Sequence, residues 1–209
     1  MQGLFPADPS LMLVLMTTLV LFAKYPVPGY AKTRLIPALG ADGAARVHRH
    51  LTERTVMILV ASSAAVEVRY AGADEDAFRS WLGSVPQYIE QVEGGLSERL
   101  IDAGRDAHHV FFGADTPDLT VAIVQSAIDA LESHDIVIGP AEDGGYYLIG
   151  MQAARPELMT DMPWSTSEVF PETMRRCAAA GLTVALLPTL ADCDRPSDLA
   201  RWPDLAALA

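Results

Sequence analysis

The sequence predicts an α/β fold in which a mainly parallel sheet is covered by helices on both faces. Short apolar runs rich in β-branched residues alternate along the chain with longer segments whose apolar residues recur at helical spacing. Such alternation is typical of βαβ units. Two strand-like runs, residues 136–139 and 146–151, are joined only by the turn PAEDGG. One strand must therefore break the alternation, and the sheet is expected to be mixed.

Each expected strand is a short run of apolar, β-branched or aromatic residues. The runs are TLVLF (18–22), VEVRYA (66–71), YIEQ (88–91), VFFG (110–113), IVIG (136–139), YYLIGM (146–151) and TVALL (183–187). In open sheets of this kind, ligands bind where the carboxyl ends of the strands meet the loops. The site is therefore expected in the segments that follow Phe22, Gly113, Gly139 and Leu187.

The expected helices lie between these runs. They are predicted at residues 43–64, 74–82, 97–107, 121–132 and 171–180. The first places Arg, His and Glu between apolar residues at helical spacing. Ser97 and Thr120 are expected to cap the third and fourth helices. Gly181 is expected to end the last one.

Length and composition limit the classes of function. The 209 residues are enough for one domain, expected at residues 16–209. The formal net charge of −12 argues against a nucleic-acid partner, although not against small phosphate ligands. The two cysteines form no CxxC pair, so reduced thiols and a cytoplasmic location are expected. No HExxH or GxSxG motif supports zinc or serine hydrolysis.

The two ends of the chain each prompt an expectation. Residues 11–23 are uncharged and mostly apolar, but this run is short for a membrane span and no positive segment precedes it. We therefore expect no membrane insertion, a leader at residues 1–15, and Met16 as an alternative start. The apolar residues 205–209 are expected to be exposed, which suggests a homodimer.

The first candidate site is the loop FAKYPVPGYAKTRL, which follows the first strand. It holds Lys24 and Lys32, the only two lysines of the chain, and Arg34. Prolines and a glycine stiffen the loop, and the three cations suit an anion such as a polyphosphate. The loop is neither a Walker A motif nor a GxGxxG motif. The alternative is a surface loop with solvated charges.

The second candidate is the acidic loop GADTPDL at the end of the fourth strand. Asp115 lies where a strand delivers its carboxyl end, and a carboxylate there can bind Mg²⁺ or Mn²⁺ and leave room for phosphates and water. The alternative for Asp115 is an Asx turn or a helix cap. Asp118 more simply opens the following helix.

The third candidate is the turn GPAEDGGYY. Gly144 and Gly145 allow unusual backbone angles and close approach of a ligand, Asp143 supplies a carboxylate, and Tyr146 supplies a flat face. An ordinary β-turn explains the same residues. In the loop MPWST, Trp164 is expected to stack on a sugar or a base, or to fill the edge of the core.

The last candidate is the segment LADCDRPSDL near the carboxyl terminus. Asp192 and Asp194 are two residues apart, so both point the same way in an extended stretch. One of them, taken here as Asp194, is expected to be a second metal ligand. A helix cap with a surface turn is the alternative.

These five motifs, in this order, resemble the DUF2064 family of glycosyltransferase-like proteins, some of which are named for arsenosugar biosynthesis. The resemblance covers about residues 19–199. The family in turn looks like part of the GT-A nucleotide-diphospho-sugar transferase superfamily. The resemblance implies a three-layer α/β/α, Rossmann-like GT-A fold, with the nucleotide over the first strand's loop and a divalent ion at Asp115. The AKTRL piece is also similar to AKSRL of 2-phospho-lactate guanylyltransferase. Arg195 stands where a Thr is common in the family, and this departure removes no charge that the mechanism needs.

The expected function is metal-dependent glycosyl transfer from a nucleotide-diphospho-sugar to a small-molecule acceptor. The expected catalytic residues are Asp115, Asp143 and Lys32. The expected ligands of Mg²⁺ or Mn²⁺ are Asp115 and Asp194. The expected substrate-binding residues are Lys24, Lys32, Arg34, Gly144, Gly145 and Tyr146. One alternative is nucleotidylyl transfer with release of pyrophosphate. Another is a non-catalytic nucleotide-binding protein.

Overall fold

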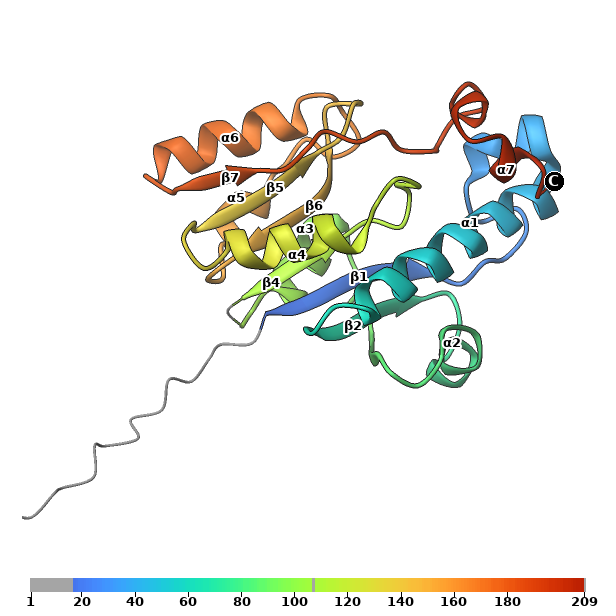
Figure 1. Cartoon of the computed structure of the whole chain (residues 1–209), viewed down its shortest axis with the longest axis horizontal. Helices are drawn as coiled ribbons and strands as arrows, with labels where there is room; N and C mark the ends of the chain where they lie inside the picture. The colour runs from blue at the N-terminus through green and yellow to red at the C-terminus, as the bar shows by residue number, and fades with distance from the viewer. Residues whose placement is uncertain (1–16, 107, 209) are drawn as a thin grey trace, which may run out of the picture.

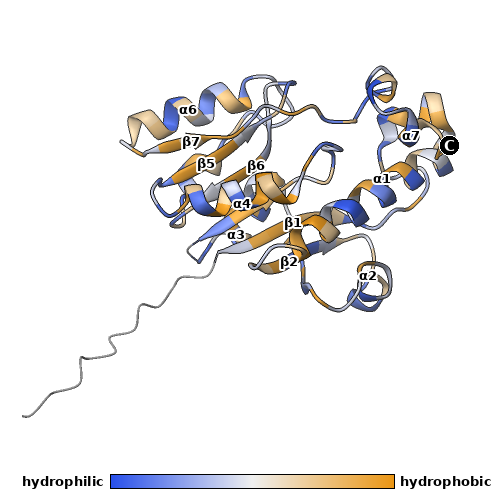
Figure 2. Ribbon diagram, viewed as in Figure 1, coloured by the Kyte–Doolittle hydropathy of each residue, from blue (hydrophilic) through white to orange (hydrophobic). Residues whose placement is uncertain are grey.

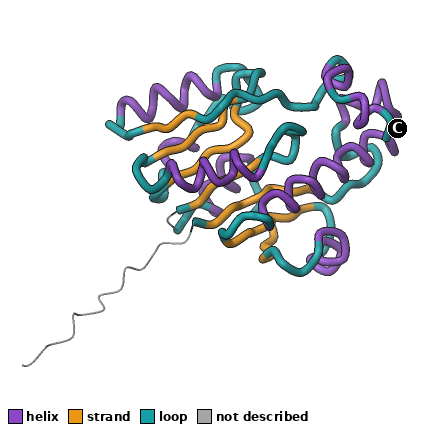
Figure 3. Tube along the Cα trace, in the orientation of Figure 1, coloured by secondary structure: helices purple, strands orange, loops and turns teal. Residues whose placement is uncertain are grey.

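A computed structural model describes residues 17–106 and 108–208 of the chain and contains one seven-stranded mixed sheet (Figures 1 and 3). The strand order is β3-β2-β1-β4-β6-β5-β7. The bounds are β1 Thr18–Lys24, β2 Ala65–Ala71, β3 Gln87–Glu90, β4 His109–Phe112, β5 Ile136–Pro140, β6 Tyr146–Met151 and β7 Val184–Leu186. Strand β6 is antiparallel to both neighbours, and the other pairs are parallel. The predicted α/β class and mixed sheet are confirmed.

Helices cover both faces of the sheet. They are α1 Ile36–Val60, α2 Glu75–Leu82, α3 Leu96–Ala103, α4 Val121–Ala130, α5 Pro156–Met159, α6 Val169–Ala179 and α7 Pro203–Ala206, with 3₁₀ turns η1 Thr33–Leu35 and η2 Asp198–Arg201. Alternate residues of β1 divide between the two faces: Leu19 and Leu21 pack with α1, α2 and α4, and Val20 packs with α3, α5 and α6. This is the expected three-layer arrangement.

The strands are nearly continuous apolar runs because they are buried in the core. Strands β4 and β5 are buried along their whole length, as expected for strands with helices on both sides. In Figure 2 the hydrophobic residues gather on the strands and on the helix faces that meet them. The loops at the carboxyl ends of β1 and β4 are thus fixed by a rigid sheet.

The segment after β7 returns across the molecule to α1 (Figure 1). Leu205 of α7 is 5% exposed and packs in a third apolar cluster with Leu35, Val47 and Cys193. The expectation of an exposed apolar surface at residues 205–209 is therefore wrong for Leu205, because α1 covers it. The same packing brings residues near 193 to the loop after β1, which matters for the site.

Most predicted elements lie within a few residues of the observed ones, with three differences. Helix α1 begins at Ile36, and Gly40 interrupts it with φ 69° and ψ 173°. Ser97 does not cap α3, since Gly95 is the cap and the Ser97 hydroxyl donates to the Met159 carbonyl at 2.6 Å. The short helices α5 and α7 and the two 3₁₀ turns were not predicted. The Thr120 cap is confirmed, as its side chain accepts from the Ile123 amide.

The expected leader at residues 1–15, and Met16, lie outside the described residues. Among the helices of the described residues, none is both long and apolar enough to cross a membrane.

Candidate active site

The centre of the site is an ion pair between the loops that follow β1 and β4. The Lys32 ammonium lies 2.7 Å from Oδ1 of Asp115. The Lys32 side chain is only 3% exposed, whereas the Asp115 side chain is 49% exposed. Strands β1 and β4 are parallel neighbours, so their carboxyl ends deliver both loops to one edge of the sheet. Lys32 of the first candidate loop and Asp115 of the second are thus brought together.

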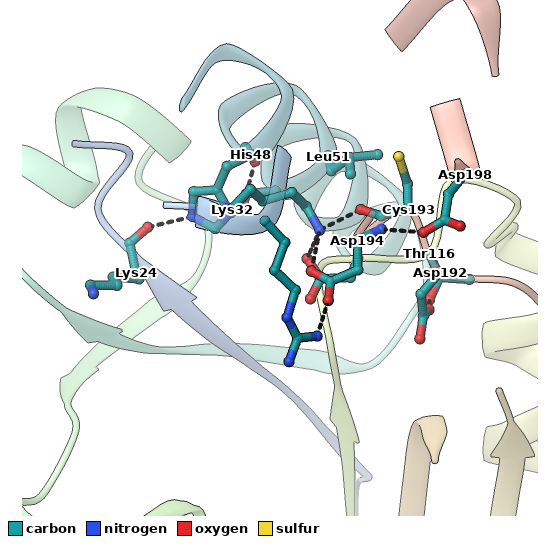
Figure 4. A network of polar contacts seen from close by, with 12 residues as sticks. Lys24, Lys32, His48, Leu51, Thr116, Asp192, Cys193, Asp194 and Asp198 are labelled. Carbon is teal, nitrogen blue, oxygen red and sulfur yellow. Dashed lines mark hydrogen bonds and ion pairs between the residues drawn. The ribbon is translucent and has the colours of Figure 1, made fainter. Parts of the chain in front are cut away.

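A third segment, after β7, completes this cluster (Figure 4). Lys32 also donates to the Cys193 carbonyl at 2.6 Å, and its Nζ lies 3.7 Å from Oδ1 of Asp194. Arg34 pairs with the other oxygen of Asp194 at 2.5 Å. The Cys193 amide donates to the carbonyl of Asp115 at 2.8 Å. Three loops that are far apart in sequence are therefore joined around one buried ammonium.

The backbone of the first loop turns Lys32 inward. Lys32 has φ 43° and ψ 49°, a left-handed conformation that few residues other than glycine adopt. The amides of Tyr30 and Ala31 both donate to the Val27 carbonyl, and Ala31 is buried. These contacts hold the strained residue in place, which is typical of functional loops.

The pair holds both partners in their charged forms. Burial alone would lower the pKa of Lys32, but the carboxylates of Asp115 and Asp194 outweigh it and raise the pKa above its ordinary value. Burial alone would likewise raise the pKa of Asp115, yet the Lys32 charge and hydrogen bond lower it below the ordinary range. Both groups are therefore ionised across the neutral pH range.

Asp192 has a different environment from Asp194, which was expected to be the second metal ligand. Its Oδ1 accepts a hydrogen bond from the Thr116 hydroxyl at 2.5 Å. Burial raises the pKa of Asp192 to about 6, and the nearby charges of Asp115 and Asp143 add to the shift, although the Thr116 hydrogen bond opposes it. Asp194, by contrast, directs both oxygens at cations. Asp192 therefore has more capacity left for a metal ion than Asp194, and only the three-dimensional arrangement distinguishes them.

Lys24 is not part of the cluster. Its ammonium lies 3.4 Å from the Tyr30 carbonyl and 5.9 Å from the centre of the Tyr30 ring, and it points away from Lys32 (Figure 4). The Lys24 carbonyl lies 2.8 Å from Nε2 of His48. Burial lowers the pKa of His48 below its ordinary value, so a neutral His48 on α1 anchors the backbone of the loop.

Arg99, which no sequence motif marks, is positioned by the side chain of Gln91. The Gln91 side-chain amide donates to the carbonyls of Ala23 and Arg69, at 3.3 and 2.8 Å. Its oxygen accepts from Arg99 at 3.0 Å. Gln91 thereby ties α3 to the carboxyl ends of β1 and β2, and it places a further cation near the same edge of the sheet.

The glycine turn between β5 and β6 has one position that only glycine fits. Gly144 has φ 91°, and a Cβ there would lie 2.5 Å from the Ser167 carbonyl oxygen. The Phe170 amide donates to the Gly144 carbonyl at 2.9 Å, so the turn packs directly against the start of α6. The Gly145 amide donates to Oδ1 of Asp143 at 2.9 Å, which orients that exposed carboxylate.

Two adjoining cavities flank this turn. One, of about 230 Å³, is mostly apolar and includes Tyr146, Trp164 and Gly145 in its walls. The other, of about 590 Å³, is a polar cleft lined by Arg34, Asp192 and Asp194. Both include Asp143, Ser165 and Thr166 in their walls. Of the predicted site residues, Arg34, Asp143, Gly145, Tyr146 and Asp194 line these cavities. Lys32 reaches the cleft through its pair with Asp194, and Asp115 is connected to it through Lys32.

Comparison with known proteins assigns the chain to a family. A family model described as "Uncharacterized protein conserved in bacteria (DUF2064)" matches residues 55–166, more than half of the chain. The chain belongs to the DUF2064 family. The DUF2064 chain is also 31% identical to a "putative nucleotide-diphospho-sugar transferase" from Desulfovibrio desulfuricans G20, with a TM-score of 0.82 over 92% of this chain and 93% of that one. No curated protein matches it significantly.

More distant solved structures confirm the fold of this DUF2064 chain. The inositol-1-phosphate CTP transferase of T. maritima has a TM-score of 0.58 at 14% identity, covering 92% of this chain and 96% of that one. Glucosyl-3-phosphoglycerate synthase of Mycobacterium tuberculosis has a TM-score of 0.56 at 13% identity, covering 92% and 76%. At such identities the likeness concerns the fold alone, and it confirms the expected GT-A and nucleotidyltransferase-like architecture.

The acidic groups of the DUF2064 chain fit a metal ion only in part. In residues 17–106 and 108–208, no group of three or more His, Cys, Asp or Glu side chains is arranged to hold an ion. Asp115 and Asp192 nevertheless offer carboxylate oxygens, the donors that Mg²⁺ and Mn²⁺ prefer. Mg²⁺ is commonly held by one or two carboxylates and completed by substrate phosphates and water. The residues fit an ion that arrives with its substrate.

Replacing Asp192 by Asn is expected to stabilise this DUF2064 chain by about 1–3 kcal/mol at about pH 8. The folded-state pKa of about 6 exceeds the ordinary 3.8, so ionised Asp192 costs stability above about pH 6. As the pH falls from 6 toward 3.8, Asp192 becomes protonated in the folded state and this cost disappears. The stability gained by Asp192→Asn should therefore be small at about pH 4. Urea unfolding at the two pH values measures it. Asp194→Asn, which breaks the pair with Arg34, should lower stability instead.

Proposed function

We propose that the chain is a glycosyltransferase that moves a sugar from a nucleoside-diphosphate sugar to a hydroxyl group. The observation that supports this most is the convergence of Lys32, Asp115 and Asp194 at the carboxyl ends of β1 and β4, beside a polar cleft. The chain's 31% identity to a protein described as a "putative nucleotide-diphospho-sugar transferase" points the same way. An ion pair on a buried ammonium, whose partners shift each other's pKa values and which lies at the carboxyl ends of the strands, is typical of a functional site.

Each side chain has a role in this proposal. The exposed guanidinium of Arg34 lines the polar cleft and presents a planar fork suited to a diphosphate. Lys32 orients Asp115 and keeps it ionised. Asp115 and Asp192 would hold Mg²⁺ or Mn²⁺, whose charge would stabilise the departing diphosphate. The structure of glucosyl-3-phosphoglycerate synthase, which shares the fold, is described as a complex with Mn²⁺ and UDP.

The proposed reaction breaks one bond and forms one. The acceptor oxygen forms a bond to the anomeric carbon, while the bond from that carbon to the diphosphate oxygen breaks and its electron pair leaves with the nucleoside diphosphate. The hydroxyl proton passes to Asp143, whose carboxylate is exposed and is oriented by the Gly145 amide. Arg34 binds the charge that develops on the leaving group, so catalysis is chiefly electrostatic.

Nucleotidylyl transfer fits the geometry less well. A triphosphate needs several cations, and Lys24 was expected to supply one of them together with Lys32 and Arg34. With Lys24 turned toward Tyr30, fewer cations are left at the Asp115 cluster. The two reactions differ in their product, since one releases a nucleoside diphosphate and the other releases pyrophosphate.

A nucleotide screen tests the proposal. Nucleoside-diphosphate sugars with Mn²⁺ are expected to raise the melting temperature by several degrees, and EDTA should remove the shift. Slow hydrolysis of the correct donor should release a nucleoside diphosphate. Pyrophosphate release from a nucleoside triphosphate would replace this proposal with the nucleotidylyl one. Tight nucleotide binding without any product from a wide acceptor panel would indicate a binding protein.

A further inference from the structure

The apolar cavity beside the glycine turn has a different chemistry from the polar cleft that it adjoins. Six of its wall residues are aromatic: Phe22, Phe111, Phe112, Tyr146, Tyr147 and Trp164. Among the described residues its only charged wall residue is Asp143, and no lysine or arginine lines it. The adjoining cleft is lined by Arg34, Arg195 and Arg201. Of these two cavities, only the cleft therefore offers cations to a phosphate group.

The size of the cavity limits what can enter it. A dry protein cavity of about 150 Å³ lined by apolar side chains can bind benzene. The 230 Å³ here holds one or two fused rings, or a short aliphatic group of similar volume. A complete nucleotide is too large and too polar for it.

The walls of the cavity are preorganised. The Trp164 indole donates to the Ser97 hydroxyl at 2.8 Å, and that hydroxyl donates to the Met159 carbonyl. The Tyr146 and Trp164 rings meet edge-on, with centroids 6.2 Å apart. An apolar ligand would not need to order these side chains, which reduces the entropic cost of binding.

The cavity and the cleft meet at Asp143, Ser165 and Thr166. A molecule whose apolar group fills the cavity would present its next atoms at this junction, beside the proposed proton acceptor. We propose that the acceptor substrate is an uncharged molecule that joins an aromatic or compact aliphatic group to a hydroxyl group. This inference rests on the proposed glycosyl transfer, and it names the acceptor class for the same balanced reaction.

Leu96 gives a test that leaves the core untouched. It is the first residue of α3, it lines the cavity, and it is 42% exposed. Leu96→Asp would place a carboxylate at the rim of the cavity, where an apolar ligand would have to desolvate it. Aspartate suits the first turn of a helix, so the fold should be retained. Val121→Asp is a matched control: Val121 is the first residue of α4, is 41% exposed and does not line this cavity.

Calorimetric titration with 2-naphthol measures binding to the cavity directly. Wild type and Val121→Asp should bind one equivalent with a Kd of about 0.1–1 mM. Leu96→Asp should raise that Kd at least tenfold. No saturable binding, or equal affinity for Leu96→Asp and wild type, would overturn the proposal.

A competition between acceptors separates this inference from the proposed function. With a donor that the protein hydrolyses, neutral aromatic alcohols should accelerate nucleoside-diphosphate release, and Leu96→Asp should raise their KM while leaving donor hydrolysis unchanged. If sugar phosphates accelerate release and aromatic alcohols do not, the acceptor class is wrong although the transferase activity stands. If no donor binds or turns over, the proposed function itself fails.

Discussion

Replacing Asp115 by asparagine is expected to lower turnover by about 100–1,000-fold. Asparagine keeps an oxygen for the Lys32 ammonium, which lies 2.7 Å from the native carboxylate. It loses the negative charge that would attract Mg²⁺ or Mn²⁺ to the donor diphosphate. The loss should therefore appear mainly as weaker dependence on metal concentration together with a lower kcat. Initial rates of nucleoside-diphosphate release across a Mn²⁺ titration measure both quantities.

The fold of this variant should survive. The Asp115 side chain is half exposed, and the backbone carbonyl that accepts from Cys193 remains. Asp118→Asn is the matched control, because Asp118 lies in the same loop and its Oδ1 only accepts a hydrogen bond from Trp202. Asparagine can make the same bond. Wild-type metal dependence in Asp115→Asn, with both variants folded, would remove Asp115 from the mechanism.

The strands and most helices were predictable because their signals are local. Apolar β-branched runs, the Thr120 cap and Gly181, with φ 68°, act through neighbouring residues. The Ser97 cap was wrong for a tertiary reason: its hydroxyl is used to join α3 to Trp164 and the carbonyl of Met159. Local propensity cannot reveal such a competing partner.

The site was predictable where topology alone brings residues together. Loops that follow parallel strands share one edge of the sheet, so Lys32 and Asp115 could be expected at the same edge, whereas the adjacency of β1 and β4 that pairs them is seen only in the structure. The position of the segment after β7 could not be predicted from the strand pattern, because it depends on the packing of Cys193 and Leu205 against α1. The same limit explains Lys24 and Asp192, whose side-chain directions are set by Tyr30 and Thr116.

Replacing Lys32 by methionine is expected to reduce turnover by up to the same factor as Asp115→Asn and also to destabilise the fold. The unbranched methionine fills most of the buried space of the lysine stem. It removes the ammonium that contacts Asp115 and the Cys193 carbonyl, and that lies near Asp194. Leaving these buried polar groups without their partner should cost about 1–3 kcal/mol of unfolding free energy at neutral pH.

The pH dependence of this loss distinguishes electrostatics from packing. The Lys32 charge lowers the pKa of Asp115 and of Asp192 in wild type, so both pKa values should rise when it is removed. Protonation then removes the unpaired charges, and the stability gap between Lys32→Met and wild type should narrow from about pH 7.5 to about pH 5. A gap of constant size would indicate lost packing alone.

A double-mutant cycle with Asp115→Asn tests whether the two residues act as a unit. If Lys32 works by orienting and ionising Asp115, Lys32→Met should cost much less turnover in the Asp115→Asn background than in wild type. Additive losses would mean that Lys32 contacts the donor phosphates independently, which its 3% exposure argues against. Because the ammonium is buried against Asp115 while the exposed guanidinium of Arg34 lines the cleft, we expect the non-additive result, with Arg34 as the cation that meets the diphosphate.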